Sequence, residues 1–195
     1  MAGDINNPRI WEGADFWTAP LGTELPEFHE SLTSAASWDP VGLLSEDGAT
    51  EGREEDSNDF WAWGSRLVRT RRSRHKRSLT VTCLEDNLVV FGLVNPGSSA
   101  ASEDGVTHRT IRIPKSERRS FLLETHDGEI TRRRHIPTGE VTAVGETTLS
   151  ESAMTAYALT ITIYPDATET LYHDYDNDPQ TDAGEGIMGT VGEEV

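Results

Sequence analysis

An alternation of residue types near the C-terminal end is the feature that most constrains the fold. Between residues 156 and 164 every second side chain is large and apolar, and the intervening ones are mostly alanine or threonine. The first set is Tyr157, Leu159, Ile161 and Ile163, and the second is Ala158, Thr160, Thr162 and Tyr164. Successive side chains of a strand point to opposite faces, so this pattern predicts a β-strand with one buried face. Such a strand requires a sheet to pair with.

Other segments resemble it, and one has helical spacing. We expect strands at 14–19 and 41–44, two between 63 and 83 separated by a basic turn at 71–77, and four more at 108–113, 120–125, 129–136 and 140–147. Segment 85–93 carries Leu88 and Phe91 at helix spacing. Glu85 and Asp86 precede them, where a helix dipole favours acids. The sequence therefore predicts a mainly β protein with one short α-helix.

The polar segments should lie outside the core. Residues 45–58 (SEDGATEGREEDSN) have no hydrophobic periodicity, which predicts a protruding acidic loop or hairpin, and 98–105 (SSAASEDG) should be a flexible loop. A chain of 195 residues is normally one domain. We therefore expect a single domain spanning 1–195, with an N-terminal arm at 1–13, a long loop at 45–62 and a C-terminal arm at 166–195.

Charge is segregated along the chain. The net charge is -17, with fourteen acids and two bases in residues 1–65, and fifteen bases and eight acids in 66–134. Residues 166–195 carry nine acids and no base. Copies of such a chain can attract one another, basic middle against acidic end, because complementary charge gives an interface its register. The alternative is a merely solvated surface.

The sequence carries no recognisable catalytic, cofactor or metal motif. A nucleophile elbow, a Walker A loop, a dinucleotide-binding glycine fingerprint and a zinc-binding HExxH are all absent. Cys83 stands alone and is expected to be a small buried hydrophobe. Asp174, Asp176, Asp178 and Glu185 copy positions of a calcium loop, but Pro179 stands where the sharp turn needs glycine. We expect no enzyme, no cofactor and no metal site.

Two basic clusters raise the alternative of nucleic-acid binding. The first contains Arg66, Arg69, Arg71, Arg72, Arg74, Lys76 and Arg77, and the second is 132–134. The whole chain is strongly acidic, and aromatic residues are not interleaved with these bases. Ion pairing between subunits is therefore the favoured interpretation, ahead of a solvated turn and of DNA or RNA binding.

A series of short motifs resembles the major tail tube proteins of long-tailed, siphovirus-type bacteriophages that infect actinobacteria. The motifs are APLGTELP at 19–26, WDPVGLLSEDG at 38–48, WAWG at 61–64, VRT at 68–70 and LEDN at 84–87. Ser65 departs from the family's AWGG-like turn, where a second glycine is usual. The resemblance covers about residues 14–95, and the second half carries no matching motif.

The resemblance implies a fold, an assembly and a location. The fold is a β-sandwich or barrel-like tail tube domain with one flanking helix. Six copies form a ring, and the rings stack through arms and a long loop into a hollow tube, beside tape measure, tail terminator and baseplate proteins. Double-stranded DNA passes through the tube to the host, and a lumen lined by acids would keep its phosphates from sticking. The protein would be made in the host cytoplasm, reside in the virion tail and contact no membrane.

We expect the self-assembly interface to centre on the acidic loop and the basic stretch, meeting across subunits around an aromatic turn. The candidate residues are Glu46, Asp47, Glu54, Glu55, Trp61, Trp63, Gly64, Arg66, Arg69 and Arg72. Trp61 and Trp63 could instead pack in their own domain. Other functions to test are a tail terminator or baseplate tube protein, an acidic nucleic-acid mimic or binder, and a small hydrolase.

Overall fold

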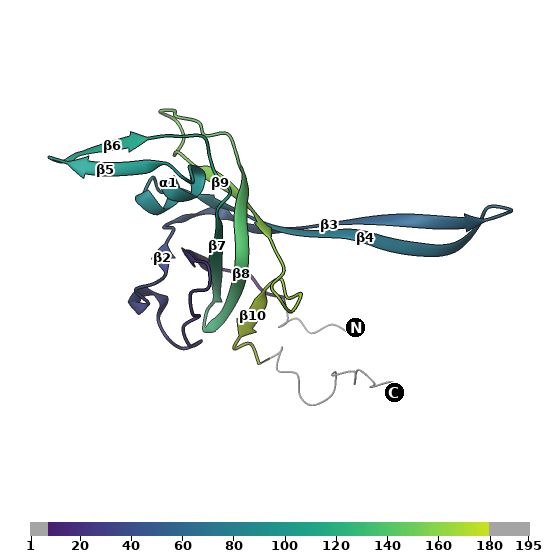
Figure 1. Ribbon diagram of the computed structural model, residues 1–195. Helices are drawn as coiled ribbons and strands as arrows, with labels where there is room; N and C mark the ends of the chain where they lie inside the picture. Colours follow the sequence, from purple (N-terminus) through teal and green to yellow (C-terminus); the bar gives the residue numbers. More distant parts are fainter. Residues whose placement is uncertain (1–7, 180–195) are drawn as a thin grey trace.

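The computed structural model describes residues 8–179, which form a mainly β domain (Figure 1). The elements in chain order are β1 (Gly13–Pro20), the 3-10 turn η1 (Leu32–Ser34), β2 (Asp39–Pro40), β3 (Leu44–Ala62), β4 (Arg66–Cys83), α1 (Leu88–Val94), β5 (Ser99–Glu103), β6 (Val106–Thr110), β7 (Arg118–Asp127), β8 (Ile130–Val144), β9 (Tyr157–Ile163) and β10 (His173–Asp176). The prediction of a mainly β fold with one short helix is confirmed.

One antiparallel sheet contains most of the strands, in the order β2-β1-β7-β8-β9-β4-β3. It is open rather than closed into a barrel, and it bends so that both of its halves contribute to one core, as in a β-sandwich. Phe16 of β1 stacks on Phe121 of β7, with ring centroids 5.7 Å apart. The alternation in β9 appears as predicted, because Leu159, Ile161 and Ile163 are all buried in this core.

Gly139 shows how tightly β7, β8 and β9 pack. A Cβ atom at this position would lie 2.8 Å from the Phe121 ring and 2.9 Å from Cγ2 of Ile161. Those contacts are shorter than carbon atoms tolerate, so this point of β8 requires glycine. Buried Cys83, at the end of β4, belongs to the same core, as expected. Burial raises the pKa of its thiol to about 11, so the thiol is unreactive at neutral pH.

The other face of β1 and β7 has its own small core. Trp17, Ala19 and Leu122 pack there against Leu32 and Trp38, which come from the segment between β1 and β2. The indole of Trp38 donates a 3.1 Å hydrogen bond to the carbonyl oxygen of Glu24. The segment 21–38 is thus held as a cover over the sheet.

Helix α1 begins where the sequence predicts a helix entry. Asn87 is its N-cap residue, and its side chain accepts a 2.9 Å hydrogen bond from the amide of Val90. Val90, Phe91 and Leu93 are buried, so the helix covers one end of the core. The helix ends at Val94, just before the Asn95-Pro96-Gly97 sequence.

Strand β10 fills an edge that β9 leaves open. Strand β8 pairs with β9 only from Gly139 onward, whereas its earlier part, residues 132–135, pairs with β10. The expected C-terminal arm 166–195 therefore contains a strand of the main sheet. Residues 1–7 of the expected N-terminal arm and 180–195 of the C-terminal arm lie outside the described residues.

Three predictions for individual segments are wrong, and a fourth, the strand at 41–44, holds only at Leu44, where β3 begins. Residues 71–77 form no turn, because β4 runs unbroken from Arg66 to Cys83. Segment 98–105 is mostly hairpin, since β5 pairs with β6. The strands expected at 129–136 and 140–147 are one strand, β8. The first two segments are exposed on both faces, so they lack the alternation that marks a half-buried strand.

His135 of β8 makes stability depend on pH. Its ring lies 5.9 Å from that of Trp38 and 6.4 Å from that of His173. Burial, assisted by the neighbouring His173, lowers its pKa from 6.5 to about 4. Between pH 4 and pH 6.5 the unfolded chain binds more protons at this histidine than the folded chain does. The folded state is therefore not destabilised by this group above about pH 6.5, and its free energy of unfolding decreases as the pH falls from 6.5 toward 4.

We therefore expect the free energy of unfolding to fall by about 2 kcal/mol between pH 7 and pH 5 through this group. His135→Phe keeps an aromatic ring at the position and removes the titration. Urea unfolding of both proteins at the two pH values measures the difference. An equal pH dependence in wild type and variant would show that His135 titrates normally.

Candidate functional site

Strands β3 and β4 form a long hairpin that leaves the domain (Figure 1). Their pairing extends from Leu44 and Cys83 at the base to Ala62 and Arg66 at the tip. Strand β4 pairs with β9 only between Arg77 and Cys83, so from residue 76 to the tip β3 and β4 pair only with each other among residues 8–179. The predicted protruding acidic segment is thus one strand of a projecting ribbon.

The lower half of the hairpin pairs its acids and bases within one chain. Glu51 contacts Arg77, and Lys76 lies 3.9 Å from Glu54. Just beyond them, at the start of the outer half (residues 56–74), Arg74 lies 3.6 Å from Asp56. Glu55 accepts hydrogen bonds from Arg53 and contacts His75 at 3.1 Å. The sequence predicts that these segments meet across subunits, whereas the structure joins them by β-pairing in the same chain. The role of Glu54 and Glu55 in assembly stays a prediction.

The outer half of the hairpin carries unneutralised positive charge. Arg66, Arg69 and Arg71 are exposed and make no hydrogen bond or ion pair within residues 8–179. Arg72 is also exposed. The hydrogen bond from Arg53 is the main cause that lowers the pKa of Glu55, desolvation opposes it, and the charge of Arg72 adds a smaller lowering effect. Residues 56–74 hold five arginines and two acids in a chain of net charge -17. The outer half therefore suits an acidic partner.

The tip of the hairpin is aromatic and exposed. The exposed fraction is 52% for Phe60, 60% for Trp61 and 104% for Trp63, and Leu67 and Val68 beside them are also exposed. The alternative that Trp61 and Trp63 pack in their own domain is therefore wrong for this structure. Exposed apolar clusters at the end of a projecting element mark interaction sites.

The conformation of the turn at the tip explains why residue 64 is glycine. Three residues, Trp63 to Ser65, connect Ala62 to its pairing partner Arg66. Gly64 has φ 86° and Ser65 has φ 59°, both in the left-handed region. Glycine adopts that region freely, so Gly64 lets the turn close and leaves Trp63 at its outermost point.

A bulge divides the hairpin into two parts. Pairing shifts between Glu55 and Asp56, and the extra residue on the opposite strand is Arg74, with φ 62°. A non-glycine residue in the left-handed region is strained and marks a local bend. Glu46 and Asp47 lie near the base in another irregular stretch, between Leu44 and Ala49, where Asp47 accepts a hydrogen bond from Ser45.

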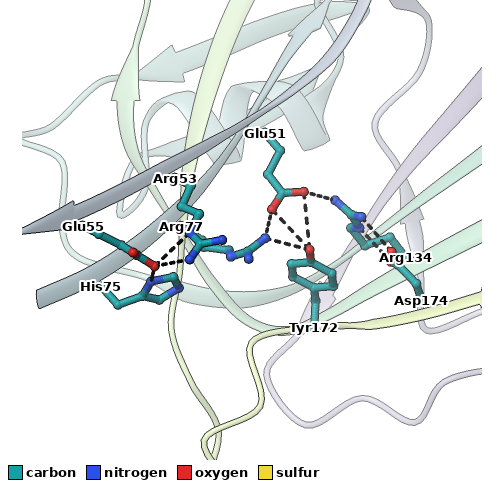
Figure 2. Close-up of polar contacts among 8 residues, drawn as sticks. All are labelled: Glu51, Arg53, Glu55, His75, Arg77, Arg134, Tyr172 and Asp174. Carbon is teal, nitrogen blue, oxygen red and sulfur yellow. Dashed lines mark hydrogen bonds and ion pairs between the residues drawn. The ribbon is translucent and has the colours of Figure 1, made fainter. Parts of the chain in front are cut away.

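A cluster of five side chains stands where the hairpin leaves the sheet (Figure 2). Arg77 of β4 donates a 3.0 Å hydrogen bond to the hydroxyl of Tyr172. That hydroxyl lies 3.2 Å from Glu51 of β3, which also accepts a 2.6 Å hydrogen bond from Arg134 of β8. Arg134 binds Asp174 of β10 through two 2.7 Å hydrogen bonds. The cluster therefore joins the hairpin to β8 and β10.

Electrostatics in this cluster favour the charged carboxylate and the neutral phenol. Desolvation raises the pKa of Glu51, but hydrogen bonds from Arg134 and Arg77 outweigh it and lower the pKa below 4.5. Burial, the largest effect on Tyr172, raises its pKa above 10. The Glu51 ion pairs are therefore complete above about pH 4.5 and weaken as the pH falls below it.

The remaining charged candidates have partners inside the chain. Arg133 is buried and binds Glu124 at 2.6 Å. Arg134 belongs to the Tyr172 cluster described above, so both of these residues of the basic segment 132–134 have acidic partners in the same chain. Arg132 lies 3.8 Å from Asp176, and Asp178 binds Arg9 at 2.7 Å. Three carboxylates of the apparent calcium loop thus contact arginines, and Glu185 lies outside the described residues. Within residues 8–179 no group of His, Cys, Asp and Glu forms a metal cluster.

Sequence reasoning missed the cluster around Tyr172. Its members come from four parts of the chain, and Tyr172 and Glu51 are 121 residues apart. One signal was available: Asp174 and Asp176 alternate, as do Arg132 and Arg134, and the register pairs Asp174 with Arg134 and Asp176 with Arg132. Matching alternations of opposite charge indicate paired strands.

Comparisons with known proteins give one family. No curated protein matches the chain, whereas the sequence pattern that defines the family described as phage tail tube protein matches residues 1–185. Among residues 8–179, no helix has the length and hydropathy to cross a membrane. The family match covers nearly the whole chain and agrees with the open, helix-poor β fold. The chain therefore belongs to the phage tail tube protein family.

Proposed function

We propose that this tail tube subunit forms hexameric rings that stack into a hollow tube, and that the β3–β4 hairpin joins neighbouring copies. Family membership makes the protein a structural component of the virion tail, built from copies of itself together with other tail proteins. The finer proposal adds passage of double-stranded DNA through the lumen without sticking, aided by the acidic excess of the chain. It also adds contact with tape measure, tail terminator and baseplate proteins, and excludes enzymatic activity.

One observation carries the proposal: within residues 8–179 the outer hairpin combines exposed aromatic residues with arginines that have no ion-pair partner, and its two strands pair only with each other. Arg66, Arg69 and Arg72 would each contribute about 0.2–1 kcal/mol against exposed acids of a neighbour. Burying a large apolar side chain such as Trp63 contributes about 1.5–3 kcal/mol. The aromatic tip therefore supplies most of the affinity, and the arginines select the acidic partner.

We propose that the tip docks in a pocket beside α1 of a neighbouring copy. A pocket of about 210 Å³ beside α1 is lined by four aliphatic or aromatic side chains of α1 and its surroundings, Val90, Phe91, Val94 and Ile111, and by Tyr157, Asn95 and the ion pair of Asp86 with Arg109. Helix α1 and the β5–β6 hairpin lie on the side away from the tip of the β3–β4 hairpin (Figure 1). Such placement suits head-to-tail contact, in which the tip of one copy occupies the pocket of the next and the contact repeats along a tube.

Trp63→Ser tests this docking. We expect the critical concentration for tube formation to rise roughly ten- to a hundredfold, because each 1.4 kcal/mol of lost burial costs a factor of ten. Sedimentation of polymer at a series of protein concentrations measures it. Leu149→Ser is the matched control, since Leu149 is 82% exposed but lies in the β8–β9 connection.

Unchanged polymerisation of the Trp63 variant would show that the tip is not part of the interface.

A parallel test reverses the charge of Arg69 and Arg72 to glutamate. We expect weaker polymerisation, most visibly at low salt, because screening already shortens the reach of these charges to about 8 Å at physiological ionic strength.

A further inference from the structure

The inner face of the hairpin changes from apolar to charged side chains where the hairpin leaves the domain. Directly paired residues share a face, so buried Leu79 lies beside Glu51, and one step outward Arg77 lies beside Arg53. Apolar packing of the hairpin against the opposite half of the sheet therefore ends at Leu79. Charged groups take over at the next position, where β4 also makes its last pair with β9, between Arg77 and Ile163.

The opposite half of the sheet reaches this point through Tyr172 and Arg134. Tyr172 packs against the edge of the main core, and its ring has a guanidinium on each of two sides: Arg134 at 4.1 Å and Arg77 at 5.7 Å from the centroid. Glu51 accepts a hydrogen bond from Arg134 and contacts Arg77 and the Tyr172 hydroxyl (Figure 2). Both hairpin strands are thus tied to β8 and to the segment before β10.

The cluster lies at the base of the hairpin, where a small change in contacts changes the direction of the whole ribbon. A two-stranded ribbon bends and twists easily when nothing packs on its faces. From residue 76 outward β4 no longer pairs with β9, so the angle at which the hairpin leaves the domain depends on the contacts at its base. The side chains of Glu51, Arg77 and Arg134 are each less than a third exposed, which limits screening of their attraction by water.

We propose that Tyr172 is a positioning residue for the hairpin: together with Glu51, Arg77 and Arg134 it fixes the angle at which β3 and β4 leave the domain. The consequence for assembly rests on the proposed function, because a fixed angle aims the tip at the next copy. The C-terminal segment thereby controls a hairpin whose contacting residues, Glu51 and Arg77, lie 121 and 95 residues earlier in the chain.

Spin-label distances in the dilute monomer test the inference. Labels on Arg71→Cys in the outer hairpin and Glu129→Cys in the β7–β8 turn report the angle, and the buried thiol of Cys83 does not compete for the reagent. We expect one narrow distance distribution in the parent protein. In Tyr172→Leu with Glu51→Gln we expect it to broaden at least twofold, and in Tyr172→Phe, which keeps the ring but loses the hydroxyl, to broaden less.

The matched control is Glu54→Gln, which removes one acid from the same strand but outside the cluster, where its ion-pair partner is Lys76, at 3.9 Å. Its distribution should equal that of the parent. Circular dichroism confirms that each variant is folded. An unchanged width in the Tyr172→Leu, Glu51→Gln protein overturns the inference even if wild-type tubes form. Absence of wild-type tubes, with broadening in the variant, overturns the proposed function and leaves the positioning role standing.

Discussion

Replacing residues 56–74 by an Asn-Gly turn is expected to abolish tube formation and leave the domain folded. Glu55 and His75 are paired neighbours, so a two-residue turn closes the shortened hairpin between them. The deleted segment holds the aromatic tip and the free arginines, while the cluster at Glu51 and Arg77 remains. Because the removed strands pair only with each other in the part of the chain that the structure describes, we expect the melting temperature to change by only a few degrees.

Sedimentation and thermal unfolding of the same preparation measure both expectations. Ser57→Ala serves as the control, because it alters the removed segment without touching its aromatic or charged residues. Tubes formed by the truncated chain would show that the outer hairpin is dispensable. A truncated chain that fails to fold would contradict the structural independence of the ribbon.

Arg133→Met is expected to destabilise the folded monomer by about 3–5 kcal/mol. The guanidinium is buried, with 2% of the residue exposed, and it binds Glu124 at 2.6 Å. It also donates to the carbonyl oxygens of Glu27 at 2.9 Å and Glu30 at 3.1 Å. Methionine fills similar space but leaves the carboxylate and the carbonyls without their donor.

Urea unfolding gives the loss directly, and two further variants sharpen it. Arg71→Met, at an exposed position that makes no ion pair within residues 8–179, should cost less than about 0.5 kcal/mol. Adding Glu124→Leu to Arg133→Met should recover part of the stability, because no buried carboxylate then remains unpaired. A loss below about 1 kcal/mol for Arg133→Met would mean that solvent reaches this pair.

These effects show which parts of the structure the sequence could predict. Strand β9 and the entry of α1 were predictable, because burial of one face imposes a period and an N-cap is a local signal. The basic half of β4 was not, because a ribbon solvated on both faces places no constraint on which positions are apolar. Without alternation, residues 71–77 have the composition of a turn and β5 has the composition of a loop.

The candidate site was predictable only in part. Trp63 and Gly64 were identified from a local motif, and the structure places them at the tip of the hairpin. Strand register decides which charged residues find partners inside the chain. It leaves Arg66 and Arg69 without an acidic partner in the described residues, and it places bases beside Glu54 and Glu55. Register follows from turn and bulge positions, which short polar segments do not reveal. Tyr172 depends on contacts between distant strands and had no local signal.

Electron microscopy of the purified full-length chain tests the central claim most directly. We predict tubes with an axial channel, built from stacked rings with sixfold symmetry, in which the β3–β4 hairpin of each subunit contacts another copy. Monodisperse monomers over a range of salt and protein concentrations would contradict the account.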